Sequence, residues 1–292
     1  MNWNNDDVPE WGQTVSYTGL VAMTAGLGYD GIEDGTGAPE APEELGALLG
    51  RHGLRVPGAY QWVRLSEPGI VDAEIEKALR VARRLQKAGA EVLLVAEHWT
   101  EARRAIAGRV GTRGGPALDG DGVACLCRAL ETLGRHVQDM GLQLALHPHV
   151  GTPVETPAEV ERVMGGTDPA LVGLCLDTGH TVYGGGDALD TARRYAARVV
   201  YVHAKDVDGE ALVEARRQGM GLLDGLRRGV FSPVYGTAAE RSTVDIDAVG
   251  TVLREAGFHG WVIQECDRNP RAGDPAAEAE AARARLARAF GA

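Results

Sequence analysis

The amino-acid sequence predicts an α/β fold built as a (β/α)8 barrel. Seven apolar stretches with strand-like composition alternate with stretches of helical periodicity, and this alternation is typical of parallel βαβ units. The length of 292 residues also suits one barrel domain of ~250 residues or more. An open doubly wound sheet is the alternative. No G-x-G-x-x-G turn follows the first strand, so the pattern does not indicate a dinucleotide site.

The expected strands and helices fill most of the chain. The strands are 29–33, 54–60, 90–97, 142–147, 171–177, 198–203 and 260–265. The helices are 13–27, 42–51, 72–88, 123–140, one that starts at Thr156, 187–197, most of 210–228, 245–256 and 274–290. A Gly-rich excursion spans 108–122, and a long loop ends near residue 243.

Local signals support the helix ends. Gly89 and Gly141 each follow the last residue of a helical pattern, where glycine is favoured. Thr156, Pro157 and Glu159 have the spacing of a capping box with proline at the first helical position. We therefore expect helices that end and begin sharply at these residues.

The first strand is the element that the sequence lacks. Eight strands would close a barrel, and the missing one should precede helix 13–27, where only Met1 to Asn5 are available. We expect either a truncated first strand or an incomplete barrel. The chain shows no linker, so we expect one domain over residues 1–292.

Composition and charge exclude several classes of protein. The net charge of −11 opposes binding to phosphate backbones, so we expect no nucleic-acid partner. No apolar run is long enough to cross a membrane, and the N-terminal sequence M-N-W-N-N-D-D is unlike a secretory signal peptide. The four cysteines form no C-x-x-C pair, which indicates buried free thiols in a reducing cytoplasm. A homo-oligomer is compatible with the sequence, but no apolar stripe marks an interface.

Four expected strands end in a residue that can bind a metal: His147, Asp177, His203 and Glu265. Barrel enzymes place their chemistry at these carboxyl ends. A single histidine at a strand end is more often a hydrogen-bonded rim residue, whereas four such residues together favour a metal site. Two imidazoles and two carboxylates suit Mn²⁺, Co²⁺, Fe²⁺, Ni²⁺ or Zn²⁺ better than Mg²⁺ or Ca²⁺.

Strand periodicity predicts where two of these side chains point. In the strand that ends at His147, the leucines share one face, and His147 shares the other with Ala145. In the strand that ends at Asp177, Cys175 and Asp177 share the face opposite the leucines. Because large aliphatic side chains pack against helices, we expect His147 and Asp177 to point into the barrel mouth.

A series of motifs then reveals a resemblance. In chain order they are N-W-N-N-D-D-V-P-E (2–10), G-Y-D-G-I-E (28–33), H-P-H-V-G-T-P-V-E-T (147–156), L-D-T-G-H (176–180), G-G-D (185–187), V-H-A-K-D-V (202–207), W-V-I-Q-E (261–265) and N-P (269–270). The chain resembles the xylose-isomerase-like TIM-barrel superfamily of sugar isomerases, epimerases and family 2 AP endonucleases. Within it, the chain is most similar to the inosose dehydratase (2-keto-myo-inositol dehydratase) branch.

The resemblance implies one divalent metal, usually Mn²⁺ or Co²⁺, at the barrel mouth. Asp177, His203 and Glu265 match three ligands of the superfamily. The fourth ligand of the epimerases is a glutamate, and His147 stands at its position. Because the epimerases use two metal-bound glutamates as paired acid and base, this histidine favours dehydration over epimerisation.

The implied activity is dehydration of a cyclic polyhydroxy ketone, an inosose or a relative, through an enediolate. The metal would bind the ketone oxygen and the adjacent hydroxyl. Glu265 and His149 are the expected base and acid, and Lys205 would stabilise the enolate oxygen. The expected substrate-binding residues are Glu33, Glu97 and His180.

Each of these roles has a structural alternative. His149 would be a rim residue, Lys205 would form a salt bridge with Asp177 or Asp206, and Glu33 and Glu97 would make strand-end hydrogen bonds. Two departures also affect the substrate. The segment D-G-T-G-A-P (34–39) lacks the lysine of the branch, and F-S-P-V-Y-G-T-A-A-E-R-S-T (231–243) replaces a short turn.

Three other functions fit parts of the pattern. A metal-dependent isomerase or epimerase of a ketose or inosose would share the enediolate and most of the site. An AP endonuclease would need further histidines and a basic DNA-binding face, which the charge of −11 opposes. A non-catalytic barrel would bind no metal and turn over no cyclitol or ketose.

Overall fold

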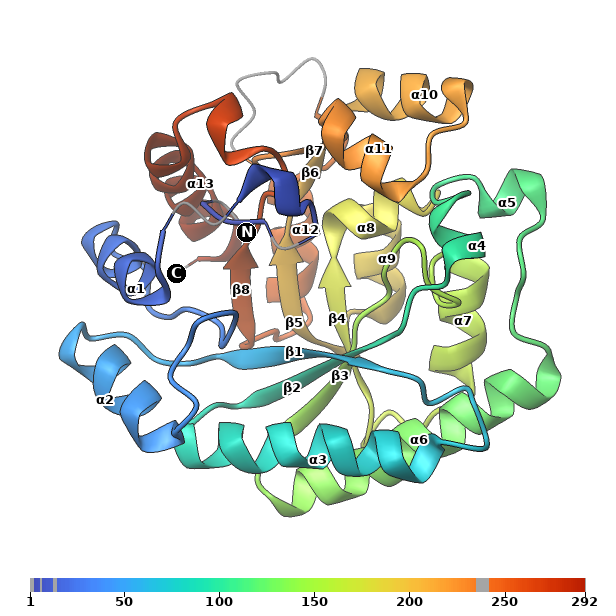
Figure 1. Cartoon of the computed structure of the whole chain (residues 1–292), viewed down its shortest axis with the longest axis horizontal. Coiled ribbons are helices and arrows are strands. Elements are labelled where there is room, and N and C mark those ends of the chain that lie inside the picture. The colour runs from blue at the N-terminus through green and yellow to red at the C-terminus, as the bar shows by residue number, and fades with distance from the viewer. Residues whose placement is uncertain (1–2, 6, 13–14, 235–241, 292) are drawn as a thin grey trace.

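The computed structural model describes residues 3–5, 7–12, 15–234 and 242–291. Its main sheet has six parallel strands in the order β1-β2-β3-β4-β5-β8. The strands are β1 (Gly58–Val63), β2 (Val92–Glu97), β3 (Gln143–Leu146), β4 (Gly173–Asp177), β5 (Val199–Ala204) and β8 (Trp261–Gln264). The sheet curves round, and helices lie on its outside (Figure 1). This is the architecture of a (β/α)8 barrel with part of its wall missing.

Helices connect successive strands. The longer ones are α1 (Tyr17–Gly26), α2 (Pro42–Arg51), α3 (Val71–Ala88), α6 (Gly120–Asp139), α7 (Pro157–Gly165), α9 (Ala188–Tyr195), α10 (Gly209–Gln218), α12 (Ile246–Glu255) and α13 (Pro275–Phe290). Shorter ones are α4 (Glu101–Arg104), α5 (Val110–Arg113), α8 (Thr178–Tyr183), α11 (Leu222–Arg228) and the 3₁₀ turns η1 (Pro9–Trp11) and η2 (Pro270–Ala272). The capping box of Thr156 and Glu159 at the start of α7 is confirmed. Among the described residues, no helix is long and apolar enough to cross a membrane.

The prediction of a strand at 29–33 is wrong. Only two isolated parallel bridges form there, Gly31 with Arg55 and Asp34 with Ala59. In the described part of the chain, no strand of the sheet lies between this stretch and β8. A strand at 29–33 would therefore have a backbone hydrogen-bond partner on one side only. Gly31 is required by close approach, since a Cβ would lie 2.7 Å from the carbonyl oxygen of Arg55 and 3.1 Å from the Trp261 ring.

The core has two layers, as strand periodicity predicts. The outward leucines of β3 and β4, Leu144, Leu146, Leu174 and Leu176, pack in the large cluster beneath the helices. Val92, Leu94, Ala145, Cys175 and Tyr201 form a separate cluster inside the barrel. Burying each leucine stabilises the fold by roughly 1.5–3 kcal/mol. Because Ala145 and Cys175 point inward, the residues that share their faces, His147 and Asp177, point inward as well.

Two further predictions concern the cysteines and the long loop. All four cysteines are free and buried, which is confirmed. The expected loop before residue 243 contains β7 (Phe231–Ser232), which pairs antiparallel with β6 (Asp206–Val207). Asp206 accepts hydrogen bonds from Ser242 and from the amides of Thr243 and Val244. These hydrogen bonds hold residues 242–244 beside β6. Residues 235–241, the rest of this expected loop, lie outside the described residues.

Candidate metal centre and active site

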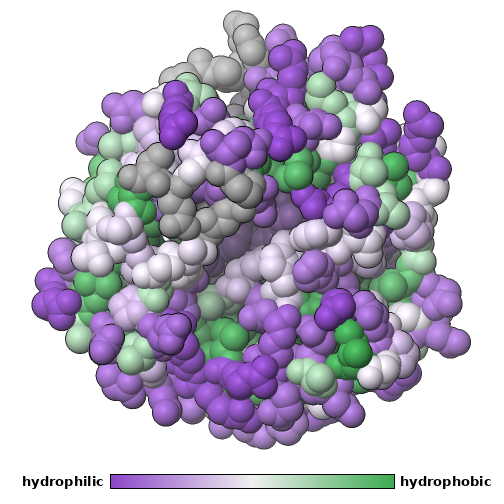
Figure 2. Space-filling view, in the orientation of Figure 1, coloured by the Kyte–Doolittle hydropathy of each residue, from purple (hydrophilic) through white to green (hydrophobic). Residues whose placement is uncertain are grey.

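A cavity of about 910 Å³ opens at the carboxyl ends of the strands and extends along β8 to α13. Its lining includes Glu33, His147, His149, His180, His203, Lys205 and Glu265. Figure 2 shows the hollow near the middle of a largely hydrophilic face. Two of the residues predicted for the site, Asp177 and Glu97, are absent from this lining, and Asp177 lies directly behind it against His147 and His203.

The four predicted metal ligands meet at the floor of the cavity. His147 Nε2 lies 3.2 Å from His203 Nδ1 and 3.6 Å from Asp177 Oδ2. His203 Nδ1 lies 3.8 Å from Asp177 Oδ2 and 3.2 Å from Glu265 Oε2. Backbone hydrogen bonds position His147 and Glu265. The amide of His147 donates to the carbonyl oxygen of Val95 and the amide of Glu265 donates to that of Ala204, which continues the strand ladders. The strand ends thus bring His147 Nε2, Asp177 Oδ2 and Glu265 Oε2 to 3.2, 3.8 and 3.2 Å from His203 Nδ1.

This donor set fits a divalent transition metal. Atoms bound to one ion at ~2.0–2.2 Å lie roughly 3–4 Å apart, which is the spacing found here. Asp177 Oδ1 accepts the amide of His180 at 2.6 Å as the N-cap of α8. Asp177 Oδ2 and His147 Nδ1 are buried without a well-aligned hydrogen bond. Asp177 Oδ2 already has a cation beside it, the Lys205 ammonium at 3.1 Å, so it is the chemistry of the donor set, two imidazoles and two carboxylates, that fits a metal.

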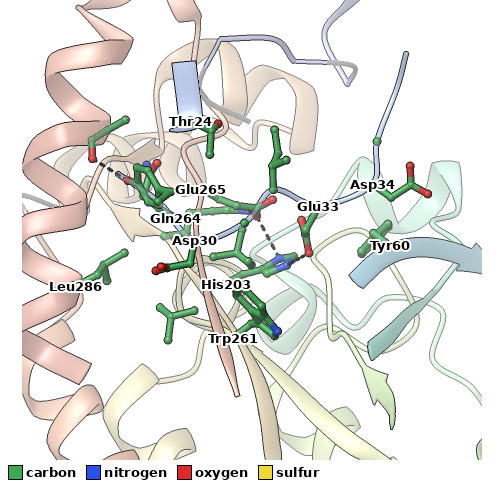
Figure 3. A pocket seen from close by; sticks show the side chains of 18 of the residues that line it. Thr24, Asp30, Glu33, Asp34, Tyr60, His203, Trp261, Gln264, Glu265 and Leu286 are labelled. Carbon is green, nitrogen blue, oxygen red and sulfur yellow. Dashed lines mark hydrogen bonds and ion pairs between the residues drawn. The ribbon is translucent and has the colours of Figure 1, made fainter. Parts of the chain in front are cut away.

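The orientation of His203 is set by a carboxylate. His203 Nε2 lies 3.1 Å from Glu33 Oε1 (Figure 3). The Tyr201 hydroxyl donates to the same oxygen. Because a carboxylate only accepts, Nε2 carries a proton and Nδ1 faces the other ligands. Burial lowers the pKa of His203, but Glu265 and Glu33 outweigh it and raise that pKa well above its usual value.

Cys175 is the remaining side chain close to these ligands. Its Sγ lies within 4.8 Å of ring nitrogens of His147 and His203. Burial raises the pKa of its thiol well above the usual value, so the thiol stays protonated. Cys175 packs in the cluster inside the barrel with Ala145 and Tyr201.

Lys205 occupies the centre of the carboxylate group. Its ammonium lies 3.1 Å from Asp177 Oδ2, 2.9 Å from Glu265 Oε2 and 2.6 Å from Asp267 Oδ2. The expected alternative pair with Asp177 is present, whereas Asp206 bonds to residues 242–244 instead. Burial lowers the pKa of Lys205, but the three carboxylates outweigh it and raise that pKa well above its usual value.

Sequence reasoning missed two residues of the cavity, Asp267 and Tyr60. Asp267 is only 3% exposed and follows Glu265 by two residues in E-C-D, where strand parity offered a signal. The buried Tyr60 hydroxyl has no hydrogen-bond partner among the residues that the structure describes, and the Tyr60 ring centroid lies 5.1 Å from that of His147. Tyr60 offered a weaker signal, as the last residue of an expected strand.

His149 and His180 form a neutral pair beside the ligands. Their ring centroids lie 3.7 Å apart. His149 Nδ1 lies 2.8 Å from the carbonyl oxygen of Val150, so Nδ1 carries the proton and Nε2 keeps a lone pair. Burial, aided by His147 and Lys205, lowers the pKa of His149 to about 3. Burial also lowers the pKa of His180 well below its usual value.

Glu97 is a predicted site residue that, among the described residues, forms no hydrogen bond or ion pair with the others. Its carboxylate accepts the amide of Leu65 and both the amide and the hydroxyl of Ser66. It is 3% exposed and is absent from the cavity lining. Glu97 thus makes the strand-end hydrogen bonds that were the alternative to substrate contact, because its side chain turns toward the loop after β1.

The buried Glu97 predicts a pH-dependent stability. Burial raises its pKa to about 7, whereas an unfolded glutamate titrates near ~4.3. The folded state therefore binds the extra proton between these values, and the free energy of unfolding falls by about 3 kcal/mol as pH rises through them. Urea unfolding at roughly pH 5 and pH 8 should show a smaller loss in Glu97→Gln than in the natural chain, and the loss that remains is expected from Glu155, whose pKa burial also raises to about 7. Equal pH slopes in the two proteins would contradict it.

Comparison with known proteins begins with a family model. The model described as xylose isomerase-like TIM barrel matches residues 21–289. An inosose dehydratase of Lacticaseibacillus casei is 31% identical over 277 residues, which cover 94% of this chain and 90% of that protein. The rhizopine catabolism protein MocC of Rhizobium meliloti is 32% identical over 288 residues, covering 99% and 86%.

Solved structures share the fold at lower identity. The IolI protein with a binding zinc atom has a TM-score of 0.66 at 16% identity, covering 95% of this chain and 94% of that one. The probable 3-DHS dehydratase AsbF of Bacillus anthracis has a TM-score of 0.68 at 15% identity, covering 93% and 94%. At these identities, the likeness concerns the fold alone.

Proposed function

The chain belongs to the xylose isomerase-like TIM barrel family, and we propose that it is a metal-dependent hydro-lyase. The proposed reaction removes water from a cyclic polyhydroxy ketone of the inosose type. The observation that carries the proposal is the approach of His147, Asp177 and Glu265 to His203, in a chain similar to inosose dehydratases. Mn²⁺ or Co²⁺ is the proposed ion, and Zn²⁺, Fe²⁺ and Ni²⁺ also suit such a donor set.

The charge of the site supports a divalent ion. Three carboxylates, those of Asp177, Glu265 and Asp267, contact the ammonium of Lys205, and a fourth, that of Glu33, contacts His203. Buried charges are expensive unless they are balanced. A divalent ion bound by the four ligands would offset the excess of negative charge. It would also polarise the ketone and stabilise the negative charge that develops on its oxygen.

The proton transfers are assigned to side chains that face the cavity. His149 Nε2 has a free lone pair, so His149 enters the reaction as a proton acceptor rather than as the acid. Nε2 would remove the proton from the carbon next to the ketone and then return it to the departing hydroxyl, which leaves as water. One residue would thus carry out both proton transfers of the dehydration. Glu265 is the other candidate base. The Lys205 ammonium would donate to the oxygen that gains negative charge.

The remaining side chains would position the substrate. His180 stacks on His149 and lines the cavity. Glu33 lines the same cavity and also orients His203, so its second oxygen is the one available to a substrate hydroxyl. The cavity is also lined by Arg55 and Arg283, but Lys205 is the cation beside the candidate ligands and is already held by carboxylates, so this part of the site suits an uncharged polyol better than a phosphate group.

Metal removal tests the proposal. Protein stripped with a chelator should release no water from 2-keto-myo-inositol, because the ketone is no longer polarised. Addition of Mn²⁺ or Co²⁺ should restore turnover, followed by mass spectrometry of the product. Full turnover in the stripped protein would contradict the proposal. A product of unchanged mass would identify the chain as an isomerase or epimerase instead.

A further inference from the structure

Lys205 and Asp267 form an ion pair inside the site that the proposed reaction does not explain. The 2.6 Å contact with Asp267 Oδ2 is the shortest of the three carboxylate contacts of Lys205. The other two contacts use Asp177 Oδ2 and Glu265 Oε2, which are the oxygens that face His203. Asp267 is thus the carboxylate partner of Lys205 that stands outside the candidate ligand set.

This arrangement sets an electrostatic conflict. A divalent ion bound by Asp177 and Glu265 would share those oxygens with the Lys205 ammonium, and two cations would lie only a few ångströms apart. Like charges repel strongly where water is excluded, and Lys205 is 1% exposed. The metal therefore binds well only if the ammonium has a counter-ion of its own.

We propose that Asp267 is a positioning residue that holds Lys205 beside the candidate metal centre, so that Lys205 yields Asp177 and Glu265 to a divalent ion without leaving the cavity. The inference rests on the proposed metal site. In the metal-free protein the ammonium contacts all three carboxylates. When the ion arrives, Asp267 keeps the ammonium in the cavity as a donor for the substrate oxygen.

The surroundings of Asp267 favour this role over a purely structural one. Its side chain lines the cavity and is 3% exposed. Oδ2 bonds to the Lys205 ammonium, whereas the buried Oδ1 has no hydrogen-bond partner among the described residues. A carboxylate placed to hold a loop would use its oxygens on backbone amides, as Asp206 does with Thr243 and Val244.

The affinity of the full chain for Mn²⁺ tests the inference without reference to turnover. Calorimetry and the electron paramagnetic resonance signal of free Mn²⁺ both measure this affinity. Asp267→Asn should weaken Mn²⁺ binding by about 10–100-fold, the range seen for side chains that support metal ligands. Asp267→Glu keeps the charge and should restore most of the affinity. In a Lys205→Met background, Asp267→Asn should change the affinity by less than about twofold, because the ammonium that Asp267 holds is gone.

Asp206→Asn is the matched control, since it removes a buried carboxylate next to Lys205 in sequence and should leave Mn²⁺ affinity unchanged. Thermal melts of each variant with and without Mn²⁺ separate loss of binding from loss of fold. Unchanged affinity in folded Asp267→Asn, or an equal loss in the Lys205→Met background, would overturn the inference and leave the dehydration standing. If the affinities follow the expected pattern but the protein leaves inosose unchanged, the inference about Asp267 would stand and the proposed dehydration would fail.

Discussion

Changing His147 to alanine is expected to weaken Mn²⁺ or Co²⁺ binding by more than about 100-fold, beyond the usual effect of a residue that only supports a ligand. Turnover should be lost with the metal. His147 Nε2 faces both His203 and Asp177 at the floor of the cavity, and alanine leaves three donors. Metal content after dialysis and affinity by calorimetry measure the effect.

His149→Ala is the control for this variant. His149 is two residues away and lines the same cavity, but it lies outside the proposed ligand set. This variant should keep its metal and lose turnover, because the proposed proton acceptor is gone. Full metal occupancy in His147→Ala would remove His147 from the ligands, and metal loss in His149→Ala would place the site elsewhere among the histidines.

Arg103→Ala is expected to lower the free energy of unfolding by about 3–5 kcal/mol, as removal of one partner of a buried ion pair does. Arg103 is fully buried and forms two bonds with Glu159, at 2.7 and 2.8 Å. Glu155 lies 3.8 Å from the same guanidinium. Without the arginine, both glutamates would be buried with no cation to balance them.

Urea denaturation measures this loss, with Arg193→Ala as the control. Arg193 pairs with Asp190 at the surface, where both side chains are more than half exposed, and its loss should cost less than about 1 kcal/mol. Equal effects of the two substitutions would contradict the assignment. The cluster also concerns the site, because Glu155 accepts the amide of Gly151 in the loop that carries His149.

Elements with strong local signals were predictable from the sequence. The helix expected at 42–51 is α2 with the same bounds, and the capping box starts α7 at Pro157. Strands with less local information were displaced. The apolar run at 54–60 predicted a strand, but its first residues make only an isolated bridge at Arg55, and β1 runs from Gly58 to Val63. An apolar pattern does not reveal which residues find a backbone partner.

The candidate ligands were predictable because their direction follows from strand parity. Each is the last residue of a strand or its neighbour, so alternation fixes the face. Glu97 and Asp267 show where this reasoning stops. Glu97 is also at a strand end, but its carboxylate turns to Leu65 and Ser66 in the loop after β1. Asp267 lies beyond its strand, and only the folded loop brings it to Lys205.

Dehydration of a cyclic polyhydroxy ketone is the central claim about this protein. Incubation of the metal-loaded chain with 2-keto-myo-inositol, followed over time by mass spectrometry, tests that claim directly. The expected result is a product lighter by one water that forms only in the presence of Mn²⁺ or Co²⁺ and is absent in His149→Ala. An unchanged substrate beside fully bound metal, or a product of the same mass, would contradict the account.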